Sequence, residues 1–260
     1  MKLKTLLLGA ALAAGLVSNA DAANLAIFGN NNIATLYGAS HTVTIVSDAQ
    51  LATAGFLSSF DAFVYTRDGY SFGTGLSAAA AANVKSYVTG NIILFNGDFQ
   101  DDIGTASTDA LFNNALNFVL SGSGGGYIGE YTGSFAAFSS NANGYSPIGL
   151  VNGSAGISGY HQGGSEGEVN ITAAGLASPV MAGVGFPYNP GAVEFGADAS
   201  GINPAQVLAT FDNGNAAIVA GNVGNISAGV PEPATWAMMI MGFGLAGSAI
   251  RRRRLQAALA

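Results

Sequence analysis

The sequence contains no cysteine, which excludes disulfide bonds, a thiol nucleophile and any metal site built on thiolates. It contains only two histidines, so a serine–histidine–aspartate triad would have to use one of them. No HExxH motif and no histidine cluster is present to indicate a zinc or iron site. We therefore predict no metal centre of these kinds and assign no catalytic residue from the sequence.

Charge is also scarce, because only 9% of the residues are charged while 49% are hydrophobic. Between residues 24 and 230 the only basic residues are Arg67 and Lys85. The same stretch holds thirteen acidic residues (the fifteen of the chain less Asp21 and Glu232), so its formal net charge is −11. Two cations cannot neutralise a row of phosphates, so nucleic acid binding is not expected. An anionic, lysine-poor surface suits a soluble exported protein and would attract Ca²⁺.

Residues 1–22 have the parts of a secretory signal peptide. Two lysines precede an apolar stretch, Leu6–Val17, and small residues at Ala20 and Ala22 suit a signal peptidase. We predict cleavage after Ala22. The alternative is an uncleaved anchor helix, which is disfavoured because the apolar stretch is short for a membrane span.

Residues 231–260 combine prolines, an apolar span and a basic run. Residues 234–250 carry no charge, which predicts a transmembrane helix near the lower length limit. The positive-inside rule keeps the basic run in the cytoplasm, so everything before Pro231 lies on the outer side of the inner membrane. Pro231 and Pro233 keep the preceding segment extended and accessible to a processing enzyme. From these properties alone, a plain C-terminal anchor is the alternative.

The details of this tail resemble the PEP-CTERM sorting signal in its PEPxxWA form. The residues that carry the resemblance are Pro231, Glu232, Pro233, Trp236, Arg251, Arg252, Arg253 and Arg254. The resemblance implies processing near the PEP tripeptide by an exosortase-type membrane protease, in Gram-negative bacteria that make exopolysaccharide. It also implies a transient stay in the inner membrane and delivery to the cell surface or extracellular matrix. The same tail has been labelled an ice-binding protein C-terminal domain, but no short threonine-rich repeat supports ice binding.

The first half of the body alternates between strand and helix patterns. Strands are expected at 25–28, 42–46, 62–66 and 92–95. Helices are expected at 33–38, at 49–60 after Ser47, from Ser77 through Val88 with Gly90 closing it, and after a cap at Thr108 or Asp109. This alternation predicts an α/β fold, with an open, mainly parallel sheet and helices on both faces.

The second half is glycine-rich and less regular. Further strands are expected at 127–131, 180–184, 206–210 and 216–220, completing the same sheet. The predicted organisation is a signal peptide (1–22), one exported α/β domain (23–220), a spacer (221–230) and the sorting signal (231–260) with its transmembrane helix.

The order of elements in the body resembles the class I glutamine-amidotransferase-like fold, in its non-catalytic or trehalose-utilisation-like branches. The segments that carry the resemblance are 38–48, 60–64, the helix ending at Val88, 92–95, and the pairing of 207–210 with 216–219. In that family the nucleophile is a cysteine on a sharp turn after a strand. Here the turn reads Phe95-Asn96-Gly97-Asp98-Phe99, with neither Cys nor Ser at its centre, so the family's reaction is not expected.

Asp98, Asp101 and Asp102 follow a predicted strand, at the carboxyl edge where α/β sheets usually bind ligands. They form either an acidic helix-start loop or a Ca²⁺ site, although the EF-hand spacing is missing. Asp98 as a replacement nucleophile is a further alternative. His161, in a predicted loop with a nearby carboxylate, is either a solvated residue or a catalytic one. His41 is interpreted as a packing residue.

These features favour a non-enzymatic surface or matrix protein that binds polysaccharide, and a purely structural component is also open. Sugars could stack on Tyr127, Tyr131, Tyr145 or Tyr160, although scattered tyrosines are commonly core residues. The alternative is a secreted hydrolase with a carboxylate site near Asp98–Asp102. Signal peptidase and an exosortase-type protease are the expected partners, and no cofactor other than Ca²⁺ is considered.

Overall fold

The computed structural model describes six stretches of the chain: residues 22–29, 31–66, 76–130, 156–162, 168–188 and 195–226. For Asn31 and for residues 156–162 and 195–200, only the backbone is described. None of the helices in these stretches has the length and apolar character needed to cross a membrane. The predicted signal peptide before Ala22 and the predicted transmembrane helix at 234–250 lie outside the described residues.

Up to residue 130 the chain alternates between strands and helices, as the sequence pattern predicts. The elements are β1 (Asn24–Phe28), α1 (Asn31–Gly38), β2 (Thr42–Ile45), α2 (Asp48–Leu51), η1 (Phe56–Ser59), β3 (Ala62–Tyr65), α3 (Ala78–Tyr87), β4 (Val88–Phe95), η2 (Phe99–Asp102), α4 (Ala106–Leu120) and β5 (Gly125–Glu130).

The second half contains shorter elements. They are β6 (Gly156–Gln162), β7 (Val169–Ile171), α6 (Ala173–Leu176), η3 (Pro179–Met181), β8 (Phe195–Ser200), η4 (Pro204–Gln206), β9 (Val207–Phe211) and β10 (Ala216–Asn222).

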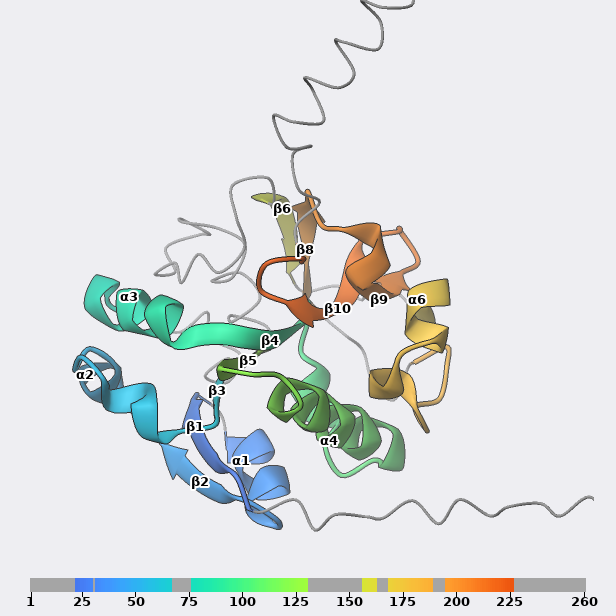
Figure 1. Ribbon diagram of the computed structural model, residues 1–260. Helices are drawn as coiled ribbons and strands as arrows, with labels where there is room; N and C mark the ends of the chain where they lie inside the picture. Colours follow the sequence, from blue (N-terminus) through green and yellow to red (C-terminus); the bar gives the residue numbers. More distant parts are fainter. Residues whose placement is uncertain are drawn as a thin grey trace, which may run out of the picture.

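An eight-stranded sheet forms the centre of the molecule, in the order β2-β1-β3-β5-β4-β10-β9-β7 (Figure 1). All pairings from β2 across to β4 are parallel, and β5 lies between β3 and β4. The three strands beyond β4 pair in antiparallel fashion. The predicted α/β fold with a mainly parallel sheet is therefore confirmed, and the added strands of the second half are antiparallel.

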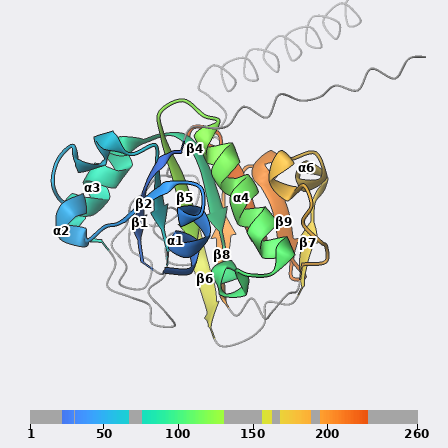
Figure 2. The ribbon, with the colours of Figure 1, turned by 90° about the horizontal axis from the view of Figure 1, so that it is seen from below.

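Helices cover both faces of this sheet, because side chains alternate along each strand. Leu25 and Ile27 of β1 pack on the face covered by α1, α4 and α6, whereas Ala26 packs on the face of α2 and α3. Figure 2 shows α4 lying along the sheet and α2 with α3 on its opposite side. Two apolar layers thus hold the sheet from both sides.

Two of the predicted helix starts are confirmed by their capping bonds. The Ser47 hydroxyl accepts the backbone N–H of Gln50, and the Gln50 side chain accepts the backbone N–H of Ser47, which is a capping box. Ser77 caps α3 by accepting the backbone N–H of Ala80. The α4 cap, however, is Thr105 and neither Thr108 nor Asp109, because the helix begins at Ala106.

Other predicted boundaries are wrong for local reasons. The helix expected at 49–60 is broken into α2 and η1 at Gly55, whose φ of 77° is left-handed. Gly90 does not close α3, since β4 starts directly at Val88 and includes Gly90. A Cβ at Gly90 would lie 2.9 Å from the Ser123 carbonyl oxygen, so glycine permits this close approach.

The strand expected at 180–184 is also absent. Pro179 lies at the start of η3 and Ser178 caps it, so the segment forms a helical turn that a proline favours. The turn continues to Gly183, with a φ of 74°. At the other end of the domain, β10 runs to Asn222 and Ile226 is fully buried, so the folded body reaches into the segment predicted as a spacer from residue 221.

In the second half, β7, α6, β6 and β8 are not expected from the sequence. The last two, β6 and β8, also differ in where they pair. They form a separate two-stranded antiparallel sheet and do not complete the main one. The sequence analysis predicts neither strand, because glycine and serine interrupt both of them and conceal the alternation of a half-buried strand.

Candidate functional site

Buried polar side chains gather at one edge of the sheet, where the parallel strands end. Apart from tyrosines, all polar or charged residues that are buried in the described ranges lie there or in the first turn of α4: Thr66, Asn96, Asp98, Gln100, Thr108 and Glu130. The ends of β4 and β5 meet at this edge, with Phe95 paired to Glu130. Ligands usually bind at this edge of an open α/β sheet, so we take it as the candidate site.

Asn96 fixes the end of β4 against β10. Its side-chain amide donates to the carbonyl oxygen of Ala216 at 2.7 Å, and its backbone N–H donates to that of Ala217 at 2.8 Å. These bonds join the parallel and antiparallel parts of the sheet next to the turn at Gly97-Asp98. The backbone of that turn is thereby held in place, which gives the following side chains defined positions.

The three aspartates of the predicted loop differ in their surroundings. Asp98 is only 4% exposed, Asp102 is half-buried and Asp101 is exposed. Burial raises the pKa of Asp102, and the neighbouring charge of Asp101 raises it further. Within the described ranges, no group of three or more histidine, cysteine, aspartate or glutamate side chains is arranged to hold a metal ion.

Tyr188 connects this loop to α4 and to β5. Its buried hydroxyl lies 2.6 Å from the Thr108 hydroxyl, and its ring lies 5.4 Å from that of Phe99. Burial raises the pKa of Tyr188 strongly and the hydrogen bond with Thr108 partly offsets this. The negative charges of three carboxyl groups raise the pKa further, in the order Asp102, Asp98 and Glu130. Asp98, Asp102 and Glu130 thus all act electrostatically on the same phenol.

Gln100 adds a second uncommon feature to the site. Its side chain is fully buried, and neither of its polar atoms has a hydrogen-bond partner in the described structure. A buried polar group without a partner costs about 1–3 kcal/mol, which makes this amide a place where a water or a ligand would be stabilised. Sequence reasoning missed Gln100, Glu130 and Tyr188. Gln100 directly precedes Asp101, but the sequence does not show that its side chain is buried, whereas Glu130 and Tyr188 are distant from the aspartates in the sequence.

The two histidines do not join this site in the described structure. His41 lies at the opposite edge, just before β2, where its Nδ1 accepts the backbone N–H of Ala23 at 3.2 Å. His161 lies on β6, paired with Gly196, and not in the loop that the sequence predicted. Its side chain lies outside the described part. A catalytic triad at the carboxyl edge therefore cannot use His41.

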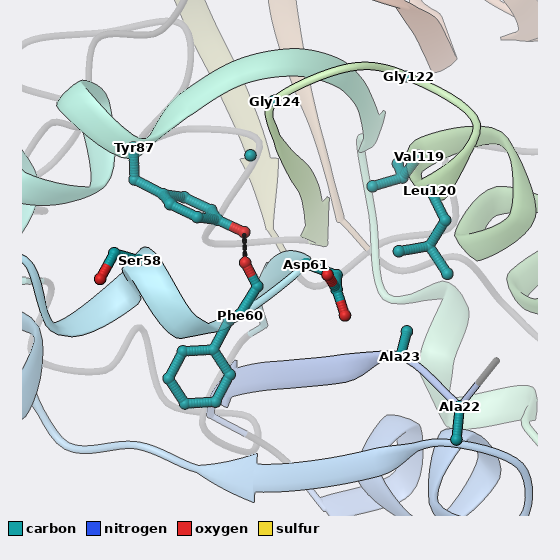
Figure 3. Close-up of a pocket in the computed structure, with 11 residues that line it drawn as sticks. Ala22, Ala23, Ser58, Phe60, Asp61, Tyr87, Val119, Leu120, Gly122 and Gly124 are labelled. Carbon is teal, nitrogen blue, oxygen red and sulfur yellow. Dashed lines mark hydrogen bonds between the residues drawn. The ribbon is translucent and has the colours of Figure 1, made fainter.

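The amino edge of the sheet contains a hollow of about 690 Å³ that the sequence analysis did not predict (Figure 3). Asp61, Tyr87 and Phe60 line it together with Ala22 and Ala23. The Tyr87 hydroxyl donates to the Phe60 carbonyl oxygen at 2.9 Å. Burial raises the pKa of Tyr87, and the charge of Asp61 adds to the shift. The turn before β5 contributes Gly122, Gly124 and Gly125 to the wall.

Of the tyrosines considered for sugar stacking, Tyr127 is fully buried on the face of the sheet that α2 and α3 cover. It is therefore a core residue. Tyr131 and Tyr145 lie outside the described residues, as does the side chain of Tyr160.

Comparison with known proteins identifies the tail but not the folded domain. The sequence model of the PEP-CTERM protein-sorting motif matches residues 229–254, which include every predicted sorting residue from Pro231 to Arg254. No curated protein and no solved structure matches the chain. The resemblance of the body to the amidotransferase-like fold thus stays a prediction. The chain carries a PEP-CTERM sorting motif, which marks it as an exported protein processed at its C-terminus by an exosortase.

Proposed function

We propose that the α/β domain is a non-catalytic component of the cell surface or extracellular matrix, and that it binds exopolysaccharide there. The observation that carries this proposal is the sorting motif at 229–254, which begins three residues after the buried Ile226. The folded domain is thus the cargo that exosortase processing releases from the inner membrane.

A binding role is supported by the chemistry of the carboxyl edge. The turn after β4 offers Asp98 in place of a cysteine or serine, and this carboxyl group is buried. His41, the one histidine whose side chain is described, lies at the far edge. Amide, hydroxyl and carboxylate groups, such as those of Gln100, Thr108 and Asp102, are the groups that hydrogen-bond to sugar hydroxyls.

Retention on polysaccharide tests this proposal. The processed protein is passed over immobilised exopolysaccharide from the producing strain and, as a matched control, over immobilised dextran. We expect retention on the first alone, and weaker retention for Asp101→Asn than for Asp61→Asn, because Asp101 is exposed at the carboxyl edge and Asp61 lies at the amino edge. Equal passage through both columns would contradict the proposal.

A hydrolase is the second candidate, favoured by the raised pKa of Asp102, which lies on the same loop as the buried Asp98. Carboxyl groups whose surroundings separate their pKa values can act as an acid and base pair. In this reading Asp102 supplies a proton and Asp98 or Glu130 acts as the base. The processed protein is assayed on a panel of glycans and esters. Turnover that is lost in Asp102→Asn would support the hydrolase, and no turnover on any substrate would exclude it.

A further inference from the structure

The two residues that flank the predicted signal-peptidase site differ in their exposure to solvent. Ala22 is exposed, whereas Ala23 is only 8% exposed and packs in the apolar layer of α1 and α4. The backbone N–H of Ala23 donates to His41 Nδ1 at 3.2 Å, and its carbonyl oxygen accepts the backbone N–H of Thr42 at 2.9 Å. The first residue of the predicted mature chain is thus fixed in the fold.

The Asp61 carboxylate binds the backbone of the next residue, Asn24. Asp61 Oδ2 accepts the backbone N–H of Asn24 at 2.7 Å, and the Asp61 N–H donates to the Asn24 carbonyl oxygen at 2.8 Å. Figure 3 shows the Asp61 side chain directed toward Ala23 inside the hollow at the amino edge. Asp61 carries the only charged side chain among the described residues that line this hollow, so its charge has no cationic side chain beside it there.

We propose that the hollow at the amino edge is a binding site for the mature N-terminus of the chain itself, with Asp61 and His41 holding the α-ammonium group of Ala23. Signal peptidase adds water across the Ala22–Ala23 peptide bond, so the water oxygen becomes part of the new carboxylate of Ala22 and both water protons end on the nitrogen of Ala23. The resulting ammonium has three N–H donors where the peptide had one. One of these N–H groups keeps the hydrogen bond to His41 Nδ1. The positive charge of the ammonium faces the Asp61 carboxylate.

The geometry also determines the order of cleavage by signal peptidase and pairing of β1 in the sheet. A protease must bind several extended residues on both sides of the bond that it cuts, but Ala23 and Asn24 are hydrogen-bonded into the start of the sheet. Cleavage therefore precedes the entry of β1 into the sheet. The ammonium then adds an ion pair at the point where the chain enters the fold, which ties down an end that would otherwise fray.

Amine labelling tests the proposal, because the mature chain has only two amines. Lys2 and Lys4 leave with the signal peptide, so the α-amine of Ala23 and the ε-amine of the exposed Lys85 remain. The processed protein is treated with an acetylating N-hydroxysuccinimide ester, and both sites are followed by mass spectrometry. We expect Ala23 to react at least about tenfold more slowly in the folded protein than in urea, because burial limits access of the ester and the neighbouring carboxylate stabilises the protonated, unreactive ammonium. Lys85 should react at similar rates in both.

Variants then separate the ion pair from simple burial. Asp61→Asn should speed the labelling of Ala23 several-fold and leave Lys85 unchanged. Asp48→Asn is the matched control, because Asp48 also accepts a backbone N–H at 2.7 Å, from Ser77, but does not line the hollow. A mature chain that does not start at Ala23, or folded Ala23 that reacts as fast as in urea, would overturn the proposal. Folded Asp61→Asn that labels at Ala23 as slowly as wild type would also overturn it, and where Asp61→Asn does not fold, His41→Gln supplies the same comparison.

Discussion

The two edges of the central sheet differ in what they bury. At the carboxyl edge, the turn after β4, the end of β5 and the start of α4 bring carboxyl groups, an amide and hydroxyl groups into contact with the core. At the amino edge the chain enters the fold, and backbone hydrogen bonds surround a hollow where Asp61 is the one charged side chain among the described residues that line it. The difference shows how a parallel sheet separates tasks, since all strands start at one edge and end at the other.

The energetic consequences differ in the same way. The buried hydroxyl groups of Thr108 and Tyr188 at the carboxyl edge depend on each other, so removing one leaves the other without this partner. Groups that line an open hollow can exchange a lost partner for water, and the loss is smaller. Equal substitutions at the two edges should therefore have unequal effects, and the predictions below run from the largest expected effect to the smallest.

The largest effect is expected at Gly29, at the carboxyl end of β1. Its φ is 119°, and a Cβ there would lie 2.5 Å from the Thr66 carbonyl oxygen on the neighbouring strand segment. Gly29→Ala should lower the free energy of unfolding by about 3–5 kcal/mol through backbone strain and overlap combined. Urea unfolding measures the change.

The control for this substitution is Gly55→Ala, which has a φ of 77° but open space within 4 Å of its Cβ position. Strain alone should cost about 1–2 kcal/mol there. Equal losses at Gly29 and Gly55 would show that the strands at the carboxyl edge are not tightly packed.

The buried hydroxyl pair of Thr108 and Tyr188 should give the next largest effect. Thr108→Val leaves the Tyr188 hydroxyl without this partner, which should cost about 1–3 kcal/mol. Tyr188→Phe should cost less, because the Thr108 hydroxyl keeps its bond with the Thr105 hydroxyl at 2.9 Å. A double-mutant cycle measures the coupling between the two residues. Additive losses would contradict the mutual dependence of groups at this edge.

Tyr87→Phe makes a similar change at the amino edge. The Tyr87 hydroxyl donates to the Phe60 carbonyl oxygen, but both line the hollow, where water can replace the lost donor. The free energy of unfolding should fall by only about 0.5–1 kcal/mol. A loss as large as that of Thr108→Val would remove the distinction between the two edges.

The smallest effect is expected from Asp102→Asn, and it should be visible mainly in the pH dependence of the free energy of unfolding. Because folding raises the pKa of Asp102, this group favours the folded state most when protonated, below its ordinary pKa of 3.8. That contribution is lost as the pH rises through the raised, folded-state value. Relative to wild type, Asp102→Asn should thus gain stability between acid and neutral pH, as followed by urea unfolding at several pH values.

Asp101→Asn is the partner experiment for this pH dependence. Removing the charge of Asp101 leaves burial as the cause of the raised pKa of Asp102. The stability of Asp101→Asn should therefore depend on pH less than that of wild type, but the dependence should not disappear. An identical pH dependence in wild type and in Asp102→Asn would show that Asp102 ionises freely in the folded protein.

Much of the first half of the fold can be predicted from the sequence because its signals are local. The apolar run after Asn24, the β-branched run before Ser47 and the capping residue Ser77 each specify an element within a few residues. Parallel pairing follows, since strands joined by a helix have to run in the same direction.

The second half is less predictable, because its sequence signals are ambiguous. The apolar run Val180–Val184 is typical of a strand, yet Pro179 and its Ser178 cap begin a helical turn. The strands β6 and β8 are interrupted by small residues and are specified by pairing with each other across the intervening chain. Such pairing depends on contacts that are distant in sequence, which no local window contains.

By itself, the sequence determined that this protein is exported and sorted by an exosortase, because the PEP tripeptide, the uncharged span and the four arginines form one contiguous segment that matches the sorting motif. It also determined that the loop of Asp98 lies at the carboxyl edge of a parallel sheet. Only the tertiary structure decided which groups surround that loop, and that Asp61 and His41 bind the backbone at Asn24 and Ala23, where the predicted mature chain starts. The reason is physical, because burial and proximity arise between residues that are far apart in sequence and exist only after the strands have paired.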